Sequence, residues 1–173
     1  MQRVVVGVDG SAAAEVALRW SGRLAAASAA ELVVVHAFRN PHAEVSPEQH
    51  ELLLAERASL VADRWVRVAV EAGGSVRTVV EAGDPRTVVL AVAEAEDADL
   101  VVLGRTGRGG GPGFLHLGSV VEHAVHHTGW PLTVIPSEVF GPIRRIVIGV
   151  DGSLASSAAV DCAPVSPARW ALR

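Results

Sequence analysis

Short apolar runs alternate with longer amphipathic stretches along the first 136 residues of the chain. The run RVVVGV at residues 3–8 is continuous and rich in β-branched side chains, which is typical of a strand covered on both faces of its sheet. Similar runs predict four further strands, at residues 31–38, 75–82, 99–104 and 131–136. Five strands of this kind require helices on both faces of one sheet.

Helix start signals precede the amphipathic stretches. Ser11 is an N-cap for a helix over residues 12–28, where Val16, Trp20 and Leu24 recur at helical spacing. Three more predicted helices begin at SPEQ (46–49), where Ser46 and Gln49 form a capping box, at Asp84-Pro85, and at Ser119, which forms a capping box with Glu122. The first of these three ends at Gly73-Gly74 and the last near Thr128-Gly129.

Strands that alternate with helices indicate an α/β fold. We expect a doubly wound, five-stranded parallel sheet with right-handed crossovers, which forms one domain over residues 1–138. The sequence RVVVGVDGS at 3–11 returns as RIVIGVDGS at 145–153. We therefore interpret residues 139–173 as the truncated start of a second repeat, with one strand and a short helix. Because an unpaired apolar strand tends to pair with a free sheet edge, we expect this segment to support a homodimer.

Composition and charge narrow the class of function. The chain has 173 residues and a net charge of −4, which gives no reason to expect nucleic acid as a partner. All fifteen basic residues are arginine, so a Schiff-base lysine and a Walker A loop are excluded. No segment approaches the roughly 20 apolar residues of a membrane span, and no signal peptide is evident. With Cys162 as the only cysteine, we expect a cytoplasmic protein that does not bind membranes.

The stretch VVLGRTGRGGGPGFLHLGSVVEHAV at residues 101–125 contains seven glycines between a predicted strand and a predicted helix. In open α/β sheets, ligands bind beyond the carboxyl ends of the strands, where the strand order reverses. If the first and fourth strands are neighbours, Asp9 faces the glycine loop across that crevice. A loop of Gly and Arg that enters a helix N-terminus favours an anion, and phosphate above all.

Each of these features also has a simpler interpretation. The loop is then a long flexible connection, Asp9 a turn residue, and Ser119 only a helix cap. His123 and His127 have the i, i+4 spacing of metal ligands, but no cysteine or suitably spaced carboxylate completes a set, so we expect a solvated or partner-facing helix surface and no metal site.

The sequence resembles the universal stress protein family. Nucleotide-binding members of that family carry Gly, two residues, Gly, nine residues, Gly and then Ser or Thr. Here Gly104, Gly107 and Gly118-Ser119 follow the pattern, with ten residues between the second and third glycine. The segments VVVGVDGS, GDPRTVVLAVAEAEDADLVVLG and PLTVIP are also similar to the family. The resemblance covers residues 1 to about 138 and implies a Rossmann-like fold of the adenine nucleotide alpha hydrolase-like kind, while residues 139–173 resemble the start of the second half of a tandem member.

The resemblance implies a stress-response regulatory protein that binds ATP or another adenine nucleotide, with Mg²⁺ bridging the phosphates and with at most slow hydrolysis. It implies that Asp9 lies along the polar edge of adenine and that the loop 104–119 holds the phosphates. The residues implied to bind the nucleotide are Gly7, Val8, Asp9, Ala37, Leu103, Gly104, Thr106, Gly107, Arg108, Gly118, Ser119, Val120 and Val121. The alternative is a nucleotide-free dimerisation or interaction module of the same fold. An ATP pyrophosphatase ranks last, because its SGGxDS motif is absent.

Overall fold

The computed structural model describes residues 1–39, 46–61, 65–70, 75–108, 116–138, 143 and 145–162. Contacts within the chain divide it into two units, Met1–Val139 and Phe140–Arg173.

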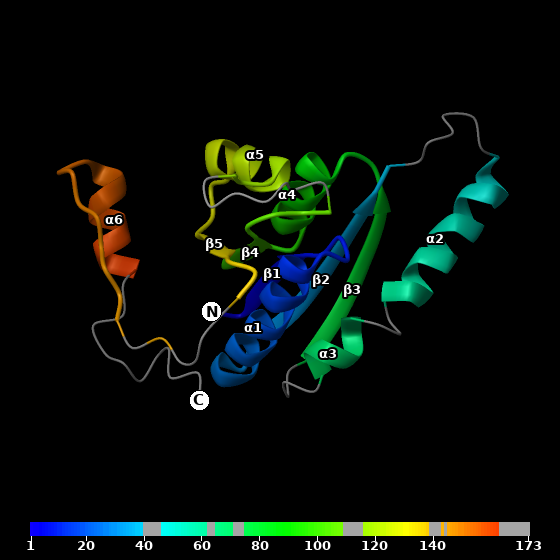
Figure 1. Cartoon of the computed structure of the whole chain (residues 1–173), viewed down its shortest axis with the longest axis horizontal. Coiled ribbons are helices and arrows are strands. Elements are labelled where there is room, and N and C mark those ends of the chain that lie inside the picture. Colours follow the sequence, from blue (N-terminus) through cyan, green and yellow to red (C-terminus); the bar gives the residue numbers. More distant parts are fainter. Residues whose placement is uncertain are drawn as a thin grey trace. The chain divides into compact units, whose positions relative to one another are not determined.

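The first unit is built on a five-stranded parallel sheet with the strand order β3-β2-β1-β4-β5 (Figure 1). The strands are β1 (Arg3–Gly7), β2 (Glu31–Phe38), β3 (Ser75–Ala82), β4 (Leu100–Gly104) and β5 (Leu132–Ile135). β1 pairs with β2 on one side and with β4 on the other, and Gly7 lies opposite both Val35 and Leu103. The predicted doubly wound parallel sheet is confirmed, and the strand order reverses at β1.

Helices cover both faces of this sheet. They are α1 (Ala12–Ser28), α2 (Pro47–Val61), α3 (Arg67–Val70), α4 (Pro85–Ala95) and α5 (Ser119–His127). α1 packs against β1, β4 and α3, whereas α4 packs against β2, β1 and α5. The single helix predicted between residues 46 and 73 is described as α2 and α3. Its predicted end at residues 73–74 lies outside the described residues.

Three predicted helix starts are confirmed. The Ser11 Oγ accepts a hydrogen bond from the N–H of Ala14 at 3.2 Å and caps α1. The Ser46–Gln49 capping box is present with both of its reciprocal hydrogen bonds. Asp84 caps α4 through its carboxylate, with Pro85 at the first helical position. These local patterns fix where each helix begins and therefore where the loops at the carboxyl edge of the sheet are located.

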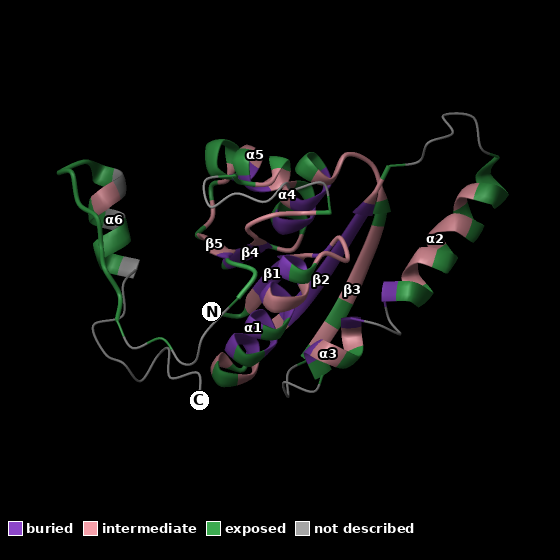
Figure 2. Cartoon of the chain, viewed as in Figure 1, coloured by how far each residue is buried: buried purple, intermediate pink, exposed green. Residues whose placement is uncertain are grey.

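The core lies on both faces of the central strands. Val4, Val5 and Val6 of β1 are completely buried, as are Val101 and Val102 of β4. Figure 2 shows this burial concentrated in the middle of the sheet and on the inner side of α1. β1 and β4 therefore form a rigid base for the loops that follow their carboxyl ends. None of the helices in the described part of the chain is long and apolar enough to cross a membrane.

The second unit differs from its prediction. Residues 145–150 were expected to form a strand, yet the structure assigns none there, and Val147 and Val150 are exposed. A strand exists only through hydrogen bonds to a neighbouring strand, and the repeated sequence alone does not supply that neighbour. The helix expected after it is present as α6 (Leu154–Cys162).

Candidate functional site

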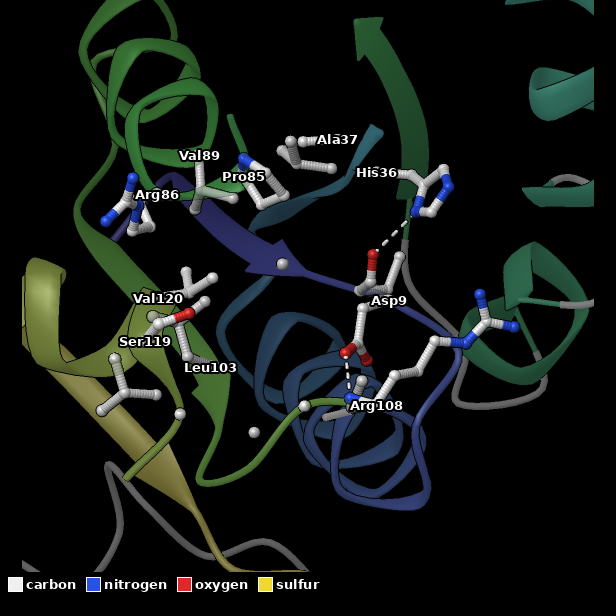
Figure 3. Close-up of a pocket in the computed structure, with 18 of the residues that line it drawn as sticks. Asp9, His36, Ala37, Pro85, Arg86, Val89, Leu103, Arg108, Ser119 and Val120 are labelled. Carbon is white, nitrogen blue, oxygen red and sulfur yellow. Dashed lines mark hydrogen bonds between the residues drawn. The ribbon is translucent and has the colours of Figure 1, made fainter. Parts of the chain in front are cut away.

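A pocket with a volume of about 560 Å³ opens at the carboxyl ends of β1, β2 and β4, where the strand order reverses (Figure 3). Its position agrees with the rule for ligand sites in open α/β sheets. The structure brings all thirteen predicted site residues to its lining: Gly7, Val8, Asp9, Ala37, Leu103, Gly104, Thr106, Gly107, Arg108, Gly118, Ser119, Val120 and Val121.

Asp9 connects the loop after β1 to the glycine loop after β4. Its Oδ1 accepts the N–H of Ser11 at 2.9 Å, and its Oδ2 accepts the N–H of Arg108 at 2.8 Å. Gly10, between Asp9 and Ser11 in the sequence, has a φ of +84°, a left-handed conformation that glycine adopts without strain. The expectation that Asp9 faces the glycine loop is therefore confirmed, and its carboxylate orders both loops.

The glycines at the pocket floor are required by close approach of other groups. A Cβ on Gly104 would lie 2.6 Å from the carbonyl carbon of Ala13, which is backbone and cannot rotate away. A Cβ on Gly107 would lie 2.7 Å from the Asp9 Oδ2, and one on Gly7 would lie 2.8 Å from the Leu103 Cδ2. The glycine pattern thus has a packing reason that is independent of any ligand.

The two ends of the glycine loop meet. The Gly118 N–H donates to the carbonyl of Arg105 at 2.8 Å, and a Cβ on Gly118 would lie 3.3 Å from the Gly107 nitrogen. Residues 109–115, which hold the other glycines of the loop, lie outside the described residues. The ten-residue spacing between Gly107 and Gly118 therefore does not force the ends of the loop apart.

The start of α5 corrects one prediction. The N-cap is Gly118, not Ser119, and no side chain caps the helix, so the predicted Ser119–Glu122 capping box is wrong. Ser119 is already the first helical residue, because the chain enters the helix one position earlier than the capping pattern suggests. Like any first turn, this one has N–H groups without partners in the helix, and here they belong to residues that line the pocket. The site therefore offers backbone donors at the positive end of a helix dipole.

The Arg108 side chain lies near Gly10 and Trp65. A Cβ on Gly10 would be 3.5 Å from the Arg108 Nη2 and 3.2 Å from the ring of Trp65. In Figure 3 the side chain extends away from Ser119. The backbone N–H of Arg108 is thus committed to Asp9, and the predicted contribution of its guanidinium to phosphate binding remains a prediction.

Sequence reasoning missed His36, which lines the pocket from β2 beside the predicted Ala37. His36 is 8% exposed, and its Nδ1–H donates to the carbonyl of Val8 at 2.9 Å. Its ring stacks with Phe38 and is tilted against Trp65, with centroids 6.4 and 5.3 Å apart. This histidine supports the loop that carries Asp9. The only sequence signal was its place at the end of an apolar strand.

Sequence reasoning also missed four charged residues of the pocket lining. Arg39, Arg57, Asp84 and Arg86 line the pocket. Hydrogen bonds from the Arg86 guanidinium and backbone N–H, with Arg39 nearby, hold the pKa of Asp84 far below its usual range. The same interaction raises the pKa of Arg86. Asp84 was recognised only as a helix cap, because nothing in the sequence places it beside Arg39.

The histidines of α5 form a separate feature. The rings of His123 and His127 stack with centroids 4.0 Å apart, and the His127 Nδ1–H donates to the His123 carbonyl. Within the described ranges, no group of three or more His, Cys, Asp or Glu side chains is arranged to hold a metal ion.

The model of the universal stress protein family matches residues 1–136 of the chain. The chain belongs to the universal stress protein family. Universal stress protein Rv1996 of Mycobacterium tuberculosis is 32% identical over 184 residues, an alignment that covers 92% of this chain and 57% of the relative. The chain thus spans little more than half the length of that relative.

Solved structures of the family share the fold. UspA from Lactobacillus plantarum is 25% identical with a TM-score of 0.63, and the match covers 78% of this chain and 97% of that one. A universal stress protein in complex with cAMP is 26% identical with a TM-score of 0.61, and the match covers 79% of this chain and 98% of that one. The pocket thus lies in a fold for which a complex with an adenine nucleotide is known.

Proposed function

We propose that this chain is a stress-response regulatory protein that binds ATP or another adenine nucleotide in the pocket at the ends of β1, β2 and β4. One observation carries the proposal. The thirteen positions that the family resemblance implies all line one pocket. The Gly118–Arg105 hydrogen bond, which closes the glycine loop at its base, agrees with it. Binding, with at most slow hydrolysis, is the proposed activity.

The lining suggests how the nucleotide is placed. The phosphates bind to the N–H groups at the start of α5 and to the loop 104–119, because these donors converge at the positive end of a helix dipole. The ribose lies on Leu103 and Gly104, which line the pocket at the end of β4. Adenine lies along Asp9 and Ala37, which border the pocket after β1 and β2.

The solved complex of a related protein with cAMP supports adenine as the base. A pocket of about 560 Å³ is within the range of small-molecule sites in proteins. Gly7, Gly104, Gly107 and Gly118 line it with backbone atoms, which fits a nucleotide held without lysine.

Mg²⁺ is proposed to accompany a triphosphate. The pocket carboxylates are Asp9, bonded to two backbone N–H groups, and Asp84, paired with two arginines. Because both carboxylates are engaged, phosphate oxygens and water would be the main ligands of the ion. The chain supplies the phosphate-binding N–H groups.

A thermal-shift titration with ATP and Mg²⁺ tests the proposal. Millimolar ATP is expected to raise the melting temperature, and Gly107→Val and Asp9→Ala are expected to reduce or abolish that rise. Gly129→Val is a matched control, because no atom lies within 4 Å of a Cβ at that glycine. Absence of stabilisation in the folded wild type would overturn the proposal, and mass spectrometry for retained nucleotide gives an independent readout.

The alternative is a nucleotide-free dimerisation or interaction module. It is favoured by the ten residues between Gly107 and Gly118, where the family pattern has nine. A folded protein that dimerises but shows neither retained nucleotide nor a thermal shift with ATP would support this alternative. For either function we propose a cytoplasmic homodimer in which the segment after residue 138 takes part.

A further inference from the structure

The pocket is positively charged although the chain is acidic. Its described lining contains four arginines and two aspartates, a net charge of +2, whereas the whole chain carries −4. Arg108 belongs to the glycine loop. The other three, Arg39, Arg57 and Arg86, form what we term the arginine cluster, and Asp84 is the only carboxylate of the lining paired with them.

One carboxylate cannot neutralise this cluster. The Asp84 Oδ2 lies 3.0 Å from the Arg39 Nη2 and 2.6 Å from the Arg86 Nη2, so both guanidinium groups share it. Arg57 has no ion pair among the described residues. The cluster therefore keeps an excess of positive charge in the lining of the pocket, a charge that an anionic ligand would balance.

Arg57 also has an unsatisfied donor. Its guanidinium lies over the Phe38 ring, 5.7 Å from the centroid, and its Nε is shielded from solvent without a hydrogen-bond partner in the described structure. A buried donor without a partner is costly, and hydrogen bonds from arginine to phosphate are among the strongest in proteins. Because the Nε itself is shielded, Arg57 would meet an anion through the terminal nitrogens of its guanidinium, which has no ion pair among the described residues.

The cluster is separate from the proposed phosphate loop. The loop follows β4, whereas Arg39 follows β2, two positions along in the sheet. At the usual spacing between strands, the ends of β4 and β2 are roughly 10 Å apart. This spacing separates the backbone of the two strand ends and leaves room for a ribose between the loop and the cluster, so an anion at the cluster can be a second phosphate of the same nucleotide.

We propose that the arginine cluster is a second anion subsite, and that the ligand is an adenine nucleotide phosphorylated on both its 5′ and its 3′ hydroxyl. The 5′-phosphate lies in the glycine loop and the 3′-phosphate turns toward Arg57 and Arg39. This inference rests on the proposed nucleotide function and specifies the class of ligand.

Isothermal titration with two probes, AMP and adenosine 3′,5′-bisphosphate, tests the subsite, because they differ only in the 3′-phosphate. The wild type is expected to bind the bisphosphate at least about tenfold more tightly, the effect of one good charge-assisted hydrogen bond. Arg57→Gln, and separately Arg39→Gln, are expected to lower this affinity ratio toward one. Arg67→Gln is the matched control, since that exposed arginine on α3 does not line the pocket, and it should keep the ratio.

The outcomes separate the two proposals. If wild type binds AMP and the bisphosphate equally well, the second subsite is refuted while the nucleotide function stands. If Arg57→Gln and Arg67→Gln lower the ratio equally, the effect is overall charge and the subsite is again refuted. If neither probe binds and ATP produces no thermal shift, the nucleotide function itself fails. A ratio that falls only in the cluster variants, and that shrinks with added salt, supports the subsite.

Discussion

Replacing Gly107 by alanine places a methyl group 2.7 Å from the Asp9 Oδ2, closer than two such atoms can pack. The carboxylate must then move, although it is held by the N–H groups of Ser11 and Arg108 at 2.9 and 2.8 Å. A hydrogen bond to a charged group contributes about 1.5–3 kcal/mol, and overpacking costs about 1–3 kcal/mol. Because Asp9 is half-buried, we expect Gly107→Ala to lower the free energy of unfolding by about 1–2 kcal/mol.

The reasoning is tested by removing the obstacle. Asp9→Ala deletes both hydrogen bonds and is expected to cost about 1–3 kcal/mol by itself. In that background the methyl group of Gly107→Ala meets no carboxylate, and the lower entropy of the unfolded chain should make the substitution neutral or stabilising by up to about 1 kcal/mol. The double variant should therefore be no less stable than Asp9→Ala alone.

Urea unfolding of the wild type, both single variants and the double variant measures this coupling. The expected interaction energy is about 1–3 kcal/mol in favour of the double variant, well above the few tenths found for independent sites. Equal costs of Gly107→Ala in the two backgrounds would refute the proposed contact. Such a result would mean that Gly107 is required by its own backbone and not by the neighbouring carboxylate.

Three further predictions follow from the same structure. Gly104→Ala should lower the free energy of unfolding by about 3 kcal/mol or more, because its methyl group meets the Ala13 backbone, which cannot move aside as a flexible side chain could. The control Gly129→Ala, whose methyl group lies in open space, should change that free energy by less than about 1 kcal/mol in the same urea assay. Because the pKa of Asp84 is lowered in the folded protein, its ion pairs contribute their full stability above the unfolded-state pKa and lose it only as pH falls through the much lower folded-state pKa. Asp84→Asn should therefore lower the urea midpoint at pH 7 and still lower it, by a smaller amount, at pH 3. Deleting residues 139–173 should change the oligomeric state measured by light scattering; an unaltered dimer would contradict a role for that segment in assembly.

Much of the site was predictable because its parts are local patterns at strand ends. Gly7 and Asp9 follow an apolar run that could only be a buried strand, and Gly104 and Gly107 follow another. Once both runs were interpreted as strands of a doubly wound sheet, the switch-point rule placed them together. Their individual roles in binding remain predictions, but the sequence pattern was enough to predict that they meet at one pocket.

The arginine cluster was not predictable in the same way. Arg57 comes from α2, while Arg39 and Asp84 follow two different strands, and only the pairing of β2 with β3 brings them to one rim. The prediction of the α5 N-cap was wrong for a related reason. Serine was the better capping residue by sequence, but the chain enters the helix at Gly118, where a side chain would be crowded against the Gly107 nitrogen.

The internal repeat separates local from tertiary control within one molecule. In both copies the DGS sequence forms the same turn: Gly10 and Gly152 have φ values of +84° and +83°, and the preceding aspartates each accept the N–H of the following serine at 2.9 Å. Those contacts span two residues, so the sequence alone determines them.

The strand before that turn behaves differently. Residues 3–7 form the fully paired centre of a sheet, whereas the closely similar residues 145–149 form no strand in the described chain and leave Val147 exposed. Turn geometry needs only neighbouring residues, but a strand needs partners from distant parts of the sequence. For this protein, the sequence by itself determined helix starts, turns and strand candidates, and the tertiary structure decided which candidate became a strand and which charges share the pocket.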